Sequence, residues 1–190
     1  MIKEQSIGNN KAIDRLKIRS EEKNDYAAIT QVNNFAFGQE NEAKLIEKIR
    51  NSPSQKTIND RYIPELSLVA ELDNKIVGYI MFSYIDLVDQ KTTKVLALAP
   101  IAVLPQYQNQ GIGSLLVDTG LEIAKKTAAP MIIVLGEPKF YHRFGFKKAI
   151  DYGIQSPFDV PEEYFMVKFL NNDCDKYQGK VMYSTAFEDV

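Results

Sequence analysis

The segment best suited to bind an anion is a polar loop with two glycines at residues 106–113. It follows an apolar run, residues 95–104, and leads into apolar residues that repeat at helical spacing. The first turn of a helix has backbone N–H groups without partners, and the helix dipole adds positive charge there. Gly111 and Gly113 have no Cβ, so a bulky anion can approach closely. No acidic residue lies within 106–117. The pattern predicts a cradle for a phosphate or a diphosphate.

The spacing Gln108-x-x-Gly111-x-Gly113 is weak evidence when taken alone, because an ordinary strand-to-helix turn explains it equally well. It lacks the Gly-Lys-Ser/Thr ending of the P-loop and the three glycines of the dinucleotide fingerprint. A nucleotide-phosphate enzyme that uses this loop is therefore disfavoured.

Two segments together resemble a known family. Residues 101–124, IAVLPQYQNQGIGSLLVDTGLEIA, resemble the acyl-coenzyme A signature of the GNAT acetyltransferases. Residues 141–146, YHRFGF, resemble the later Tyr-x-x-x-Gly-Phe element of that family, in the expected order. The resemblance covers roughly residues 16–150 and is closest to a branch of uncharacterised bacterial GNAT proteins. It implies an N-acetyltransferase domain of the α/β class, with a central mixed β-sheet and helices on both faces.

The resemblance implies acetyl-coenzyme A (acetyl-CoA) as co-substrate and no metal. The diphosphate would lie on backbone amides at the start of the helix, and the pantetheine arm would pair with the edge of the strand at residues 101–104. The thioester carbonyl would lie near the Val103 amide, which would stabilise the negative oxygen formed on attack. The expected cofactor-binding residues are Ile101, Ala102, Val103, Gln108, Asn109, Gln110, Gly111, Ile112, Gly113 and Ser114.

Tyr141 is the catalytic side chain that the resemblance implies, as a donor to the departing thiolate of coenzyme A. An unperturbed phenol titrates near ~10 and a thiol near ~8.5, so full proton transfer is uphill by about 2 kcal/mol. A hydrogen bond to the thiolate is the safer description. The alternative is a half-buried tyrosine at the edge of the core.

A general base is harder to identify, and an amine acceptor must lose a proton before it attacks. Glu137, just beyond the strand at residues 131–135, is the nearest carboxylate to the expected site, and Glu71 and Asp86 are others. For each, a solvated surface charge is the competing interpretation, and a chain of water molecules is a further route. His142 adjoins Tyr141 on a short helix, so its side chain points about 100° away, which favours a surface role.

The remaining elements follow from periodicity and turn residues. Helices are expected at about 25–37, with Ser20 as a cap and Ile29, Val32, Phe35 and Ala36 inward, and at 42–50. Strands are expected at 16–19, 66–72, 75–88, 94–103, 131–135, 165–169 and 181–186, and a short helix at 139–144. Pro100 predicts a bulge or a local strand separation, and Gly78 predicts a bulge or a close backbone approach.

Composition limits the class of protein. A chain of 190 residues with 45% hydrophobic and 25% charged residues suits one globular domain, here residues 15–190 after a polar extension at 1–14. A net charge of −2 gives no reason to expect a nucleic acid or an anionic membrane as partner. The single cysteine, Cys174, excludes an internal disulfide. The absence of a long apolar run predicts a cytoplasmic protein.

The acceptor is the part of the function that the sequence leaves open. Its pocket is expected between the first two helices, residues 25–50, and the C-terminal strands. The predicted partners are acetyl-CoA and an unidentified amine; the oligomeric state stays open, with a homodimer as one option. The competing hypothesis is a non-catalytic acyl-CoA-binding or sensor module.

Overall fold

The computed structural model describes residues 15–51, 62–171 and 176–187. The predicted N-terminal extension, residues 1–14, lies outside the described residues. So does most of the polar loop predicted at residues 51–60.

The strands of the described residues form one mixed sheet in the order β1-β2-β3-β4-β5-β8-β6, with β9 pairing both β3 and β7. Their bounds are β1 Leu16–Ser20, β2 Tyr62–Leu72, β3 Lys75–Val88, β4 Thr92–Val103, β5 Met131–Leu135, β6 Lys147–Lys148, β7 Ile154–Gln155, β8 Phe165–Phe169 and β9 Gly179–Met182. β4 and β5 run parallel, as do β7 and β9, and the other pairs are antiparallel. The predicted mixed sheet and the predicted parallel pair around the central helix are confirmed.

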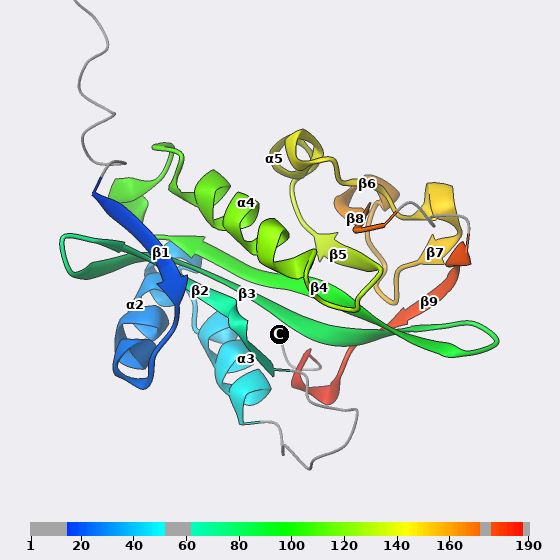
Figure 1. Ribbon diagram of the computed structural model, residues 1–190, viewed down its shortest axis with the longest axis horizontal. Helices are drawn as coiled ribbons and strands as arrows, with labels where there is room; N and C mark the ends of the chain where they lie inside the picture. The colour runs from blue at the N-terminus through cyan, green and yellow to red at the C-terminus, as the bar shows by residue number, and fades with distance from the viewer. Residues whose placement is uncertain (1–14, 52–61, 172–175, 188–190) are drawn as a thin grey trace, which may run out of the picture.

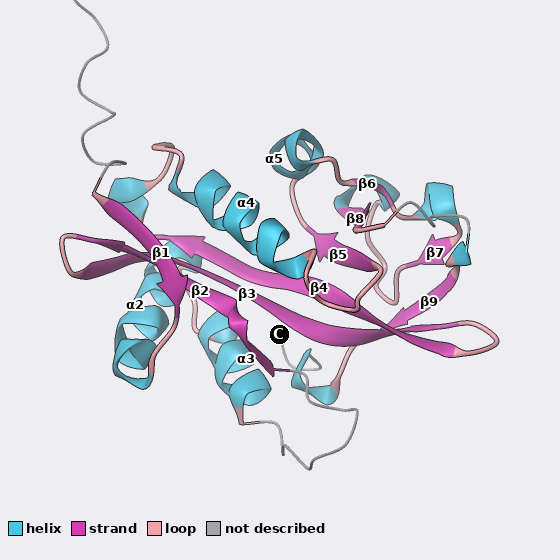
Figure 2. Cartoon of the chain, viewed as in Figure 1, coloured by secondary structure: helices cyan, strands magenta, loops and turns pink. Residues whose placement is uncertain are grey.

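Helices cover both faces of this sheet, as predicted. The helices α2, Tyr26–Phe37, and α3, Asn41–Arg50, lie on one face, and α4, Ile112–Ala124, and α5, Pro138–Tyr141, lie on the other (Figure 1 and Figure 2). Short 3-10 turns link the elements: η1 Lys23–Asp25, η2 Pro105–Tyr107, η3 His142–Phe144, η4 Ile150–Tyr152, η5 Glu162–Tyr164 and η7 Thr185–Phe187. β4 therefore lies between two helical layers, which explains its continuous apolar run.

The start and the inward face of α2 differ from the prediction. Ser20 ends β1 and does not cap a helix; Glu22 and Asp25 instead form a capping box around η1. Ile29 and Val32 are each 1% exposed, but Phe35 is 65% exposed, so its predicted burial is wrong. The buried face of α2 instead includes Asn33, whose side-chain amide donates to the Ile29 carbonyl at 2.9 Å.

The hairpin between β2 and β3 follows its sequence signals. Asp73 and Asn74 both have positive φ, 50° and 62°, as a tight two-residue hairpin turn requires. The register then shifts by one residue beside Gly78, which confirms the predicted bulge. A Cβ on Gly78 would lie 3.1 Å from the Leu116 side chain, so α4 packs closely on this strand.

Candidate active site

A fork between β4 and β5 opens the sheet at its centre. The two strands pair only at Leu96–Ile132 and Ala97–Ile133. Beyond this point β4 gains one residue relative to β3, because the partner of Phe82 is Leu98 but the partner of Ile80 is Ile101. The bulge predicted at Pro100 is therefore confirmed, and the edge of β4 that would face β5 is left open.

The open edge presents backbone groups of alternate residues. The Leu104 N–H donates to the Val77 carbonyl of β3 at 2.9 Å. Because backbone groups alternate in direction along an antiparallel strand, those of Val103 and Ile101 face away from β3, toward the opening. The Val103 carbonyl accepts a hydrogen bond from the Gln108 side-chain amide at 2.9 Å. The Val103 N–H faces the same opening.

The loop before α4 brings backbone donors to one end of this opening. Asn109 and Gly111 have φ of 59° and 88°, in the left-handed region that glycine adopts without strain. Among the described residues, no side chain caps α4, and the first turn of α4 holds no acidic residue. The first turn of an α-helix leaves its amides without intrahelical acceptors, here those up to Ser114, since Leu115 N–H donates to the Gly111 carbonyl. This geometry suits an anion.

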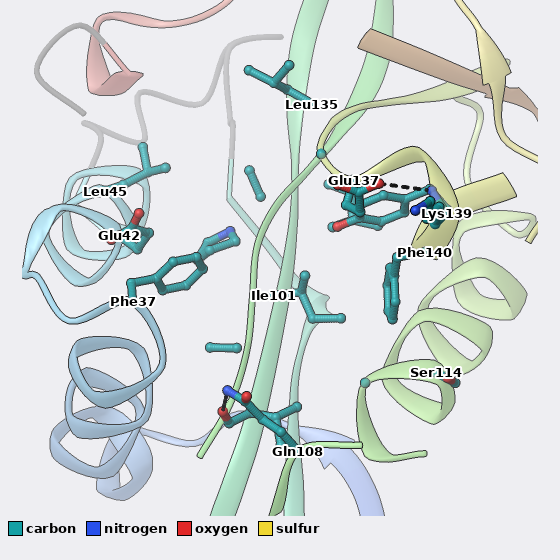
Figure 3. A pocket seen from close by; sticks show the side chains of 18 of the residues that line it. Phe37, Glu42, Leu45, Ile101, Gln108, Ser114, Leu135, Glu137, Lys139 and Phe140 are labelled. Carbon is teal, nitrogen blue, oxygen red and sulfur yellow. Dashed lines mark hydrogen bonds between the residues drawn. The ribbon is translucent and has the colours of Figure 1, made fainter. Parts of the chain in front are cut away.

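The fork and the loop line one pocket of about 1110 Å³ (Figure 3). Of the sequence-predicted residues, it brings together Ile101, Ala102, Val103, Gln108, Asn109, Gly111, Gly113, Ser114, Glu137 and Tyr141. Two predicted residues do not line it. Gln110 folds its side chain back onto the Gln106 carbonyl at 3.0 Å, and Ile112 is 5% exposed in the core. The assignment of these two can therefore rest only on their backbone.

Tyr141 lines the pocket from a tightly packed position at the end of α5. Its side chain is buried, and its ring lies edge-on to Phe140 and Phe146, with centroids 4.9 and 5.6 Å away. A Cβ on Gly136 would lie 2.4 Å from the ring, so the glycine makes room for it. Burial raises the pKa of the Tyr141 phenol above its usual value. The hydroxyl is therefore a neutral donor at physiological pH.

The four candidate base residues have different surroundings. Glu137 is exposed, lines the pocket and caps α5, where its carboxylate accepts from the Lys139 N–H at 3.4 Å. Glu71 and Asp86 lie outside this pocket in ion pairs, Glu71 with Arg19 at 2.7 Å and Asp86 with Lys94 at 2.7 Å. His142 is exposed and also lies outside the pocket. Glu137 is the one that geometry leaves as a candidate.

Sequence reasoning expected the first two helices and the C-terminal strands around the acceptor but named none of the lining residues. The pocket wall beyond the fork consists of Phe37, Glu42, Leu45, Leu98, Ala99, Pro100, Phe158, Val160, Tyr183 and Phe187. These residues come from five separate segments and share no spacing. In Figure 3, Phe37, Glu42 and Leu45 lie across the pocket from Lys139, Phe140 and Ser114. The pocket therefore connects the α2/α3 face with the α4/α5 face through the fork.

The described residues contain no group of three or more His, Cys, Asp or Glu side chains arranged to hold a metal ion. Within the same part of the chain, no helix is long and apolar enough to cross a membrane.

Comparison with known proteins identifies the family. The model of the acetyltransferase (GNAT) family matches residues 27–146. The uncharacterized N-acetyltransferase YjhQ of Escherichia coli K12 is 34% identical over 145 residues, which cover 75% of this chain and 76% of YjhQ. YhbS of the same strain is 31% identical over 154 residues, covering 80% and 86%.

Solved structures of GNAT family proteins have a similar fold. The crystal structure of the GNAT family N-acetyltransferase YhbS from E. coli in complex with CoA has a TM-score of 0.81 at 29% identity and covers 92% of each chain. That of a GNAT family acetyltransferase from Brucella melitensis in complex with acetyl-CoA has a TM-score of 0.72 at 30% identity, covering 90% and 97%. The chain belongs to the acetyltransferase (GNAT) family, as its motifs predicted. It is an acetyl-CoA-dependent acetyltransferase.

Proposed function

We propose that this protein transfers the acetyl group of acetyl-CoA directly to a primary amine. The observation that carries the proposal is that the uncapped start of α4 and the open edge of β4 line the same pocket. A molecule that joins a diphosphate to a thioester arm would use the start of α4 for its diphosphate and the open edge of β4 for its arm. The complexes of the E. coli and Brucella relatives with CoA and acetyl-CoA support the same cofactor here.

The cofactor would be held chiefly by backbone. The amides of Asn109, Gln110, Gly111, Gly113 and Ser114 would take the diphosphate, and many donors at a helix start suit this group better than one side chain. The pantetheine arm would pair with the β4 edge at residues 101–104, displacing the Gln108 side chain from the Val103 carbonyl. The thioester oxygen would then meet the Val103 N–H.

The reaction proceeds by attack of the amine nitrogen on the thioester carbon. Negative charge that develops on the carbonyl oxygen is stabilised by the Val103 N–H. The C–S bond breaks, the acetyl group stays on nitrogen, and the electron pair leaves on sulfur. Tyr141 donates a hydrogen bond to that sulfur, and its raised pKa argues against full proton transfer. Glu137, directly or through water, takes the proton that the nitrogen loses.

The test measures thiol release with acetyl-CoA and a panel of primary amines. Tyr141→Phe should lower kcat by roughly 100-fold while leaving the Kd of acetyl-CoA unchanged. Tyr164→Phe is the matched control, because Tyr164 is 38% exposed and lies outside the pocket. Saturable binding of acetyl-CoA without thiol release for any amine would contradict catalysis and leave an acyl-CoA-binding module.

A further inference from the structure

The charged side chains of the pocket are divided between its two halves. Lys139 and Arg143, on α5 and η3, lie with Glu137, the N-cap of α5, on the side of the α4 start, where an anionic cofactor would bind. Across the fork, the charged lining residue that the described α2/α3 face contributes is Glu42 of α3 (Figure 3). Among the described residues, the half that would receive the acceptor is therefore lined by one acidic side chain and by no basic one.

Glu42 has unused hydrogen-bonding capacity. One carboxylate oxygen accepts from the Gln39 side-chain amide at 2.9 Å. The other oxygen, Oε2, is buried and has no hydrogen-bond partner among the described residues. A buried carboxylate oxygen without a donor is costly, so a rotation of the carboxylate that brings this oxygen to a donor in the pocket is favoured. An ammonium group supplies a positive charge and up to three donors.

The rest of the pocket wall beyond the fork is apolar and largely aromatic. Phe37 and Leu45 contribute to it from α2 and α3. Phe158, Tyr183 and Phe187 form a chain of rings, with centroids 5.2 Å apart for the first pair and 4.7 Å for the second. All line the same pocket. Such rings favour the apolar body of a ligand, and their faces also attract a cation.

We propose that Glu42 determines acceptor specificity by binding the acceptor in its ammonium form, which releases one proton to solvent before its nitrogen attacks the thioester. The acceptor class is a primary amine on an apolar or aromatic body that carries no carboxylate beside the amine. An amino acid would place its own carboxylate in the half that holds Glu42, where like charges repel. This inference rests on the proposed function, because it names the second substrate of the same site.

Three matched amines test it: 2-phenylethylamine, phenylalaninamide and phenylalanine. They share the aromatic body and the amine and differ in the group beside the amine. In the wild-type protein, kcat/KM should favour 2-phenylethylamine over phenylalanine by about tenfold or more, with phenylalaninamide close to 2-phenylethylamine. Glu42→Gln should reduce that ratio several-fold and keep the Gln39 contact. Glu47→Gln, on the exposed side of α3, removes the same charge outside the pocket and should leave the ratio unchanged.

Separate measurements distinguish a failure of the role of Glu42 from a failure of the proposed function. A wild-type ratio near one, or an unchanged ratio in Glu42→Gln, would overturn the role of Glu42. Acetylation of other amines without turnover of any of the three probes would also overturn it. Calorimetry with acetyl-CoA alone tests the cofactor site independently, and failure there would instead refute the proposed function.

Discussion

Gly113 allows the charge at the start of α4 to be changed without strain. It is the second residue of the helix, and a Cβ there would make ordinary contacts, 3.7 Å to Phe140, 3.8 Å to Val103 and 3.9 Å to Ile101. Replacement by Ala, Gln and Glu therefore forms a graded series: a methyl group, a neutral side chain of matched size, and a carboxylate at the place proposed for the diphosphate.

The series has opposite effects on folding and on binding. Removing a helical glycine stabilises a helix by up to about 1 kcal/mol, and a carboxylate in the first turn adds about 0.3–1 kcal/mol. For a chain of this size, 1 kcal/mol corresponds to a rise in Tm of about 2–4 °C. We therefore expect Gly113→Glu to melt a few degrees above the wild-type protein when no ligand is bound.

Binding of coenzyme A should weaken in the same variant. Two unit charges ~5 Å apart at an effective dielectric of ~20 repel by about 3 kcal/mol. Salt and water at the open pocket screen part of this, which leaves a loss of about 1.5–2 kcal/mol, or roughly tenfold to thirtyfold in Kd relative to Gly113→Gln. Thermal unfolding and calorimetric titration with coenzyme A measure both effects. Equal Kd values for the Glu and Gln variants would refute the reasoning.

Three further predictions concern packing, the buried ion pair and pH. Gly136→Ala should lower kcat more than it changes the KM of acetyl-CoA, because the added methyl displaces the Tyr141 ring; unchanged kcat would contradict that packing. Arg50→Met should lower Tm by on the order of 10 °C, because it leaves the fully buried Glu21 carboxylate without its cationic partner. Arg15→Met, which removes an exposed ion pair with Asp73, should have little effect. Burial raises the pKa of Tyr79, Tyr141 and Tyr183, so the unfolded chain loses these protons first as pH rises. The free energy of unfolding should fall above pH ~10, by about 1.4 kcal/mol per pH unit for each such tyrosine; equal stability in urea at pH 9 and 11 would refute this.

The half of the pocket that we propose for the cofactor could be predicted from the sequence because its parts are consecutive. A buried strand, a glycine loop and an amphipathic helix follow one another over residues 95–124, and each has a local signal. Pro100 predicted the bulge for a similar reason, since proline cannot donate in a ladder. Here local chemistry and the tertiary structure agree.

The half that we propose for the acceptor could not be predicted because its residues converge only in the fold. Glu42 occupies an ordinary polar position of an amphipathic helix, and Phe158 and Tyr183 come from C-terminal segments without a motif. Helical periodicity also predicted that Phe35 is buried, but the buried face of α2 includes Asn33 instead. The room that Gly136 makes for Tyr141 depends on how α5 returns over β5, which no spacing indicates.

The most direct test of the cofactor site is a crystal structure of this protein with acetyl-CoA. We expect diphosphate oxygens about 3 Å from the backbone nitrogens at residues 109–114, and the thioester oxygen at the same distance from the Val103 nitrogen. A diphosphate bound away from the start of α4, or an acetyl group outside the β4–β5 fork, would contradict the account.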